Sequence, residues 1–183
     1  MPREGRVFTR WRREPDPGPG YAQLPADGAC LSAFLLIVDP SDPSRVLLGT
    51  PEPSADWERI GALDPARLDR LVGRWMLPSS HLLEYESPAE AAARIAREQL
   101  GRPDLVLRGP EVVSDAYGRP GASDRHWDLD FLFRSEWPGE VPLRAAPWAR
   151  LAFLDPRQTP SAEFGRAHDD ILRFAGYETG TGP

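Results

Sequence analysis

The chain lacks several features that would place it in a specialised class. A single cysteine, Cys30, excludes a disulfide bond within the chain. The longest apolar run covers residues 33–38, whereas a membrane-spanning helix needs roughly 18 to 20 apolar residues. No apolar segment follows the N-terminal arginines, so the sequence shows no secretory signal. We therefore expect a protein of the cytoplasm with no membrane partner.

Lysine is absent, and 28 acidic residues outnumber 22 basic ones to give a formal net charge of -6. This balance argues against a nucleic-acid polymer as partner, because neutralising many phosphates requires a basic surface. A small nucleotide-like ligand remains compatible, since a local group of arginines suffices to bind one. Hydrophobic residues make up 40% and charged residues 27% of the chain, as is ordinary for a globular protein.

The length of 183 residues suits one domain with a sizeable core. Residues 1–29 are rich in Arg, Pro and Gly and predict an N-terminal arm without regular structure. Residues 30–177 predict a single domain, in which about 51–73 form an insertion. We expect residues 178–183 to be a flexible tail.

Hydrophobic patterning predicts strands that alternate with helices. We expect strands at residues 30–38, 45–49, 106–108, 111–117, 125–133 and 148–154. We expect helices after Pro65, at about 88–100 and at about 161–176, with His168 on a solvated face of the last. This order predicts an α/β sandwich (α+β) with a mixed sheet.

The helix at about 88–100 has the clearest signals. Ser87 is a good N-cap, Pro88 suits the first helical position, and Glu90 places a carboxylate in the first turn. Gly101 then ends the helix.

The segment 80–102 resembles a Nudix box, whose pattern is Gly, five residues, Glu, seven residues, then Arg-Glu-apolar-any-Glu-Glu-any-Gly-apolar. The spacing is unbroken, and the matching identities are Glu86, Arg94, Glu98 and Gly101. The departures are Ser80 for Gly, Ile95 for the Glu after the Arg, Gln99 for the second Glu of the pair, and Arg102 for an apolar residue. The resemblance is therefore to a degenerate box.

The resemblance implies a Nudix-like α/β/α sandwich, a homodimer, and hydrolysis of nucleoside diphosphates linked to another group with Mg²⁺ or Mn²⁺. Glu98 would be the surviving catalytic and metal-binding acid. Glu86 and Arg94 would clamp the box loop to its helix. Residues Ser79, Ser80 and Trp57 would contact the substrate. The alternatives are that Ser79 and Ser80 are ordinary loop residues and that Trp57 covers the core of the insertion.

Two carboxylates that would hold the metal are absent, since positions 95 and 99 are neutral. Substitute ligands could come from one face of the strand at 125–133, which carries His126, Asp128 and Asp130. These would join Glu98, and either His81 or Glu84. The alternative is a half-buried strand whose polar side meets solvent.

Two functions remain open on the sequence. One is a Nudix-type hydrolase with weakened or altered metal-dependent catalysis. The other is a catalytically inactive nucleotide-binding, regulatory or interaction module. In that case Ile95 and Gln99 mark a site that no longer catalyses a reaction. Convergence of two or three carboxylates near Glu98 would favour the enzyme.

Overall fold

The computed structural model describes residues 28–83, 85–117, 126–139 and 147–180, so the predicted N-terminal arm lies outside the described residues except at its last two positions. The strands are β1 (Gly28–Asp39), β2 (Asp42–Pro51), β3 (Ser79–His81), β4 (Arg108–Tyr117), β5 (His126–Glu136) and β6 (Trp148–Leu154). The helices are α1 (Trp57–Gly61), α2 (Pro65–Leu71), α3 (Pro88–Leu100) and α4 (His168–Phe174), with short 3₁₀ turns at Pro156–Gln158 and Ser161–Glu163. No described helix is long and apolar enough to cross a membrane.

The strands form one mixed sheet in the order β4-β5-β1-β2-β6, and β3 pairs with β1. The pairing of β1 with β5 is parallel, whereas β1–β2, β1–β3, β2–β6 and β4–β5 are antiparallel. The predicted α+β class with a mixed sheet is thereby confirmed.

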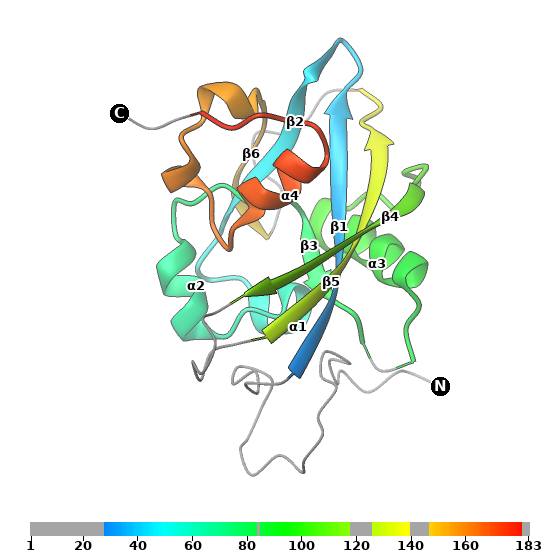
Figure 1. The fold of residues 1–183 in the computed structure, drawn as a ribbon, viewed down its shortest axis with the longest axis vertical. Helices are drawn as coiled ribbons and strands as arrows, with labels where there is room; N and C mark the ends of the chain where they lie inside the picture. Colours follow the sequence, from blue (N-terminus) through cyan, green and yellow to red (C-terminus); the bar gives the residue numbers. More distant parts are fainter. Residues whose placement is uncertain (1–27, 84, 118–125, 140–146, 181–183) are drawn as a thin grey trace.

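Helices α3 and α4 lie on opposite faces of this sheet (Figure 1). Side chains of β1 alternate between the two faces, as the pleat requires. The cluster on the α3 face contains Ala33, Leu35, Ile37, Ile95, Ala96 and Phe133. The cluster on the α4 face contains Phe34, Leu36, Leu77, Leu132, Ile171 and Leu172. Any polar residue on a strand can therefore be assigned to one face by its position in this alternation.

Helix α3 begins and ends where the sequence predicts. The Ser87 side chain accepts from the Glu90 N–H at 3.3 Å, and the Glu90 carboxylate accepts from the Ser87 N–H at 2.9 Å, which completes a capping box. At the other end Gly101 has φ 64°, a left-handed conformation that glycine adopts without strain.

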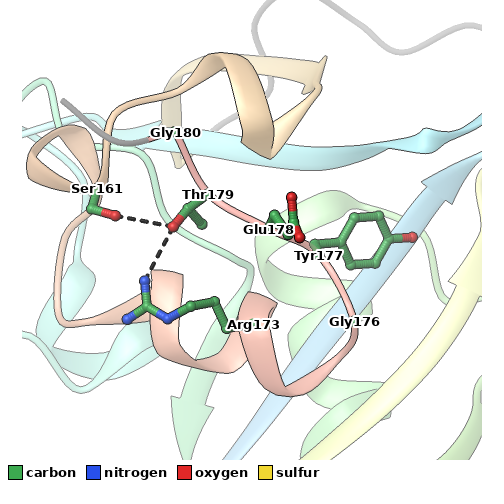
Figure 2. Close-up of a pocket in the computed structure, with 7 residues that line it drawn as sticks. All are labelled: Ser161, Arg173, Gly176, Tyr177, Glu178, Thr179 and Gly180. Atoms are coloured by element: carbon green, nitrogen blue, oxygen red, sulfur yellow. Dashed lines mark hydrogen bonds between the residues drawn. The ribbon is translucent and has the colours of Figure 1, made fainter. Parts of the chain in front are cut away.

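The C-terminal part differs from the sequence prediction. A helix was expected over about 161–176, but α4 begins only at His168, because Arg166 and Ala167 have φ of 57° and 54° and interrupt it. The first residues of the expected tail, up to Gly180, lie against the body of the domain. Thr179 bonds Ser161 at 3.0 Å and Arg173 at 3.1 Å, beside a surface pocket of about 730 Å³ (Figure 2).

Candidate functional site

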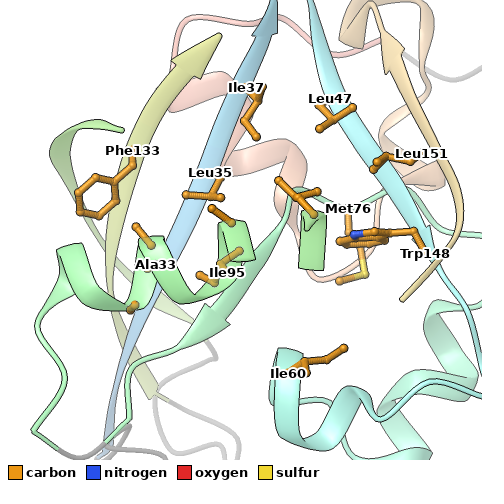
Figure 3. Packing of buried hydrophobic residues seen from close by; sticks show 14 of the residues in the cluster. Ala33, Leu35, Ile37, Leu47, Ile60, Met76, Ile95, Phe133, Trp148 and Leu151 are labelled. Atoms are coloured by element: carbon orange, nitrogen blue, oxygen red, sulfur yellow. The ribbon is translucent and has the colours of Figure 1, made fainter. Parts of the chain in front are cut away.

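The two neutral box positions on α3 are built into the protein interior. Ile95 is fully buried in the cluster on the α3 face, together with Leu35 and Ile60 (Figure 3). Gln99 is also fully buried; its Nε2 donates to the carbonyls of Ser79 (2.8 Å) and Ile60 (2.9 Å), and its Oε1 accepts from the Ser79 N–H (3.2 Å). Neither side chain is available to a cation.

The insertion at about 51–73 contributes residues that bury this part of α3. Trp57 of α1 is 1% exposed, donates through Nε1 to the Glu52 carbonyl at 3.0 Å, and meets Trp148 edge to face with centroids 4.7 Å apart. Trp148 in turn donates to the Gln99 carbonyl at 2.8 Å. The Trp57 ring therefore belongs to the core that covers α3, in agreement with the alternative in which it covers the core of the insertion.

Glu98 is the one box acid that keeps some exposure, with 23% of its side chain accessible. Its carboxylate lies 3.4 Å from Arg59 of α1 and 3.3 Å from Arg97. Within the described ranges no group of three His, Cys, Asp or Glu side chains is placed to hold a metal ion. A single carboxylate between two arginines does not fit Mg²⁺ or Mn²⁺, which need several oxygen ligands.

Glu86 and Arg94 form the predicted clamp geometry. The guanidinium donates through Nε and Nη2 to the two carboxylate oxygens at 2.8 and 2.9 Å, and a further bond of 2.9 Å reaches the His81 carbonyl. The second carboxylate oxygen also accepts from the Leu83 N–H at 2.8 Å. Both side chains are less than a tenth exposed, so this ion pair fixes the loop against α3 in the interior.

The predicted substitute ligands lie on the wrong face of the sheet. Phe131 and Phe133 of β5 pack with the α3 cluster, whereas Leu132 packs with the α4 cluster. By the alternation of the strand, Asp128 and Asp130 share the α4 face with Leu132. The structure therefore places these two carboxylates on the face of the sheet opposite to α3, which carries Glu98. The side chain of His126, and Glu84 altogether, lie outside what the structure describes.

Ser79 and Ser80, the predicted substrate contacts of β3, are 4% and 3% exposed and point to opposite faces. Ser80 pairs with Ala33 on the α3 face, and Ser79 pairs with Phe34 on the α4 face. Only Ser79 therefore belongs to the same face as Asp128 and Asp130.

The α4 face carries a group of buried or half-buried polar residues that we call the polar cluster. Its members are Cys30, Ser32, Ser79, His81, Asp128, Asp130, Arg166 and His168. Ser32 and His81 are neighbours across β1 and β3, with Oγ and Nδ1 3.1 Å apart. Burial and the adjacent Asp128 carboxylate raise the pKa of the Cys30 thiol to about 12, so this thiol stays protonated.

Two members of the polar cluster were missed as site residues in the sequence analysis. His168, expected on a solvated face, is 1% exposed; its Nδ1 accepts from the Leu77 N–H at 2.9 Å, and its ring meets Phe34 edge to face. Arg166 lies two residues earlier and interacts electrostatically with Asp128 and Asp130. No simple sequence pattern predicts their burial, because their placement depends on the left-handed backbone conformation of the two residues before α4.

Two side-chain atoms of the polar cluster, the His168 Nε2 and the Ser79 Oγ, are buried without a hydrogen-bond partner among the described residues. Buried polar groups are nearly always satisfied, so these two atoms indicate a place where a ligand or water completes the bonding.

We expect His168 to make stability depend on pH. Burial, and secondly the nearby Arg166 charge, lower the pKa of this imidazole well below its usual value of 6.5. Below about pH 6.5 the unfolded chain then binds more protons than the folded one. The free energy of unfolding therefore decreases as the pH is lowered, by up to about 1.4 kcal/mol per pH unit. Urea unfolding of wild type and His168→Gln between pH 5 and 8 checks this; equal slopes would contradict it.

Comparison with known proteins agrees with this architecture at the level of fold. No family model and no curated protein sequence matches the chain. The structure is similar to the E. coli dihydroneopterin triphosphate pyrophosphohydrolase, with 18% identity and a TM-score of 0.52 over 79% of this chain and 93% of that one. It is also similar to the M. Smegmatis Nudix hydrolase RenU, with 19% identity and a TM-score of 0.52 over 81% of this chain and 88% of that one.

A third similar structure is the NUDIX domain of Shewanella oneidensis NrtR complexed with ADP ribose, with 14% identity and a TM-score of 0.52 over 80% of this chain and 85% of that one. At these identities the likeness concerns the fold alone. The described part of this chain therefore has the Nudix fold.

Proposed function

We propose that this chain binds a nucleotide-like ligand, a nucleoside diphosphate linked to another group, without hydrolysing it. The observation that carries the proposal is the burial of Ile95 and Gln99 at the two box positions where the resemblance expects metal-binding carboxylates. An ion that is not held cannot activate water or offset the charge that develops on phosphorus. Loss of these ligands therefore removes the chemistry but leaves the fold.

The polar cluster on the α4 face supports retention of a ligand. Arg166 contributes a guanidinium that interacts electrostatically with Asp128 and Asp130, and His168 contributes a buried ring nitrogen with no hydrogen-bond partner among the described residues. A guanidinium in general is suited to the oxygen acceptors of a nucleotide-like molecule. The ADP-ribose complex of the NrtR NUDIX domain provides the first probe to try.

The competing function is weakened hydrolysis, favoured by the retention and partial exposure of Glu98. Calorimetric titration with ADP-ribose and with GDP-mannose, each in Mg²⁺ and in EDTA, separates the two functions when the ligand is afterwards recovered and analysed by chromatography. We expect at least one ligand to bind equally well in both buffers and to be recovered intact. Mg²⁺-dependent cleavage that is lost in Glu98→Gln would overturn the proposal.

A further inference from the structure

A groove of about 530 Å³ lies at the end of the sheet where β1 and β5 finish side by side (Figure 1). The groove exists because β4 pairs with β5 only from Arg108 onward, opposite Arg134, so the described residues 135–137 have no partner on β4. Its volume is within the range of small-molecule sites. The described residues that line the groove include none of the polar cluster, so it is a separate place on the molecule.

The floor and one wall of the groove are apolar. Leu105 and Trp137 are 9% and 1% exposed and belong to the cluster on the α3 face, and Val38 packs against the cluster on the α4 face. Val106 also lines the groove and is 71% exposed. A ligand that covers this side chain gains free energy, because removing apolar area from water is favourable. The groove therefore suits a molecule with an apolar part.

The charged side chains of the groove differ in how they are paired. Four line it, namely Asp104, Arg108, Arg134 and Glu136. Arg102 holds the Asp104 carboxylate at 2.7 Å, and Glu111 holds the Arg134 guanidinium at 2.6 Å. The side chains of Arg108 and Glu136 are exposed and have no ion pair or hydrogen bond within the described residues. One cation and one anion are thus left to face a ligand.

The register of the strands places these two charges on one face of the sheet. Arg108 is opposite Arg134, and Glu136 follows Arg134 by two residues, so the three side chains share a face. Diagonal neighbours of this kind are roughly 7 to 8 Å apart on adjacent strands. Val38 of β1 pairs with Glu136 and lies beside it on that face. A positive and a negative group are therefore presented a short distance apart, next to apolar surface.

This arrangement discriminates between ligand charges. A simple anion would reach Arg108 but would bring its charge beside Glu136 and Asp104, which is unfavourable at short range. A simple cation would meet the same difficulty at Arg108 and Arg134. A zwitterion avoids both, because each of its charges meets an opposite one and the resulting charge-assisted hydrogen bonds are stronger than neutral ones.

We propose that this groove binds a small zwitterion with an apolar side chain, an α-amino acid or a dipeptide with free ends. Arg108 donates to its carboxylate, Glu136 accepts from its ammonium group, and its side chain lies against Leu105 and Val106. The inference goes beyond the proposed nucleotide binding, because the groove shares no described residue with the polar cluster and is a second ligand site.

The experiment is a titration of the isotope-labelled full chain, followed by nuclear magnetic resonance of its backbone amides. The ligands are L-leucine, leucyl-leucine, N-acetyl-L-leucine without an ammonium group, L-leucinamide without a carboxylate, and glycine without a side chain. We expect leucine or leucyl-leucine to shift the signals of residues 104–108 and 134–139, and the tighter of the two identifies the length of the ligand. N-acetyl-leucine, leucinamide and glycine should each bind at least tenfold more weakly.

Variants assign the two ends of the ligand. In Arg108→Gln, leucine should bind at least tenfold more weakly and no better than leucinamide, because its carboxylate has lost its partner. In Glu136→Gln, leucine should bind no better than N-acetyl-leucine. Arg70→Ala, an exposed arginine of α2 that does not line the groove, is the matched control and should behave as wild type. All three positions are exposed, so the variants should unfold at the same urea concentration as wild type.

Three results would overturn the inference. N-acetyl-leucine that binds as tightly as leucine, and is lost in Arg108→Gln, would replace it with a site for apolar monocarboxylates. Equal binding of every ligand except glycine, in wild type and in both groove variants, would show an apolar groove without charge recognition. Unshifted signals of residues 104–108 and 134–139 at millimolar ligand would show that the groove is not a site. The nucleotide proposal is tested with other ligands, so it stands or fails separately.

Discussion

Replacing Ile95 with glutamate, which restores a carboxylate of the box pattern, is expected to destabilise the fold by about 4 kcal/mol or more instead of creating a metal site. Ile95 is fully buried within the cluster on the α3 face, so the substitution removes apolar packing and places a carboxylate where water cannot reach it. Effects of this size are expected when an unpaired charge enters a core. Urea unfolding monitored by circular dichroism at pH 7 measures the loss.

Ala93→Glu is the matched control, because it adds the same carboxylate to the same helix at an exposed position. It should change stability by less than about 0.5 kcal/mol. Burial would raise the folded-state pKa of the new glutamate in Ile95→Glu above its unfolded value, so the defect should shrink as pH falls toward about 4 and grow as pH rises. An Ile95→Glu protein as stable as wild type that binds Mg²⁺ would show that this position faces an open site.

Removing one partner of the Glu86–Arg94 clamp should have the second largest effect. Glu86→Ala leaves the Arg94 charge in the interior with only the His81 carbonyl to bind, and loss of one partner from a buried ion pair costs about 3 to 5 kcal/mol. Chemical denaturation of Glu86→Ala, Arg94→Leu and the double variant measures this. The double variant should be destabilised by less than the sum of the single ones, because no charge is left unpaired.

The exposed ion pair between Glu111 and Arg134 is the control for the clamp. Its side chains are 44% and 37% accessible, so Glu111→Ala should cost no more than about 1 kcal/mol despite a distance of 2.6 Å. Equal losses for Glu86→Ala and Glu111→Ala would contradict a buried, structural role for the clamp. A gain of stability in Glu86→Ala would contradict it more strongly.

The parts of the fold that depend on local chemistry were predictable from the sequence. Helix α3 follows from a capping serine, a proline at the first position and a terminal glycine, all of which act over a few residues. Strand β6 matches its predicted bounds of Trp148 to Leu154. The clamp geometry follows from box spacing, because the positions of Glu86 and Arg94 relative to the helix start are fixed by that pattern.

The location of the polar side chains was not predictable in the same way. Alternation placed Asp128 and Asp130 on one face of their strand, but which helix covers that face depends on the pairing of the whole sheet. Helix α1 has only five residues and is stabilised by contacts of Trp57 with Trp148, distant in sequence. The role of Arg166 depends on a backbone conformation that no composition rule indicates.

The most direct test of the central claim, that the box helix holds no catalytic metal, is an electron paramagnetic resonance titration of Mn²⁺ into the wild-type protein and Glu98→Gln. With Ile95 and Gln99 buried and Glu98 placed between Arg59 and Arg97, we predict that the free Mn²⁺ signal keeps its full intensity in both proteins. The opposite result is a free Mn²⁺ signal that is lost in wild type at stoichiometric Mn²⁺ and restored in Glu98→Gln. That result would contradict the account and support metal-dependent hydrolysis.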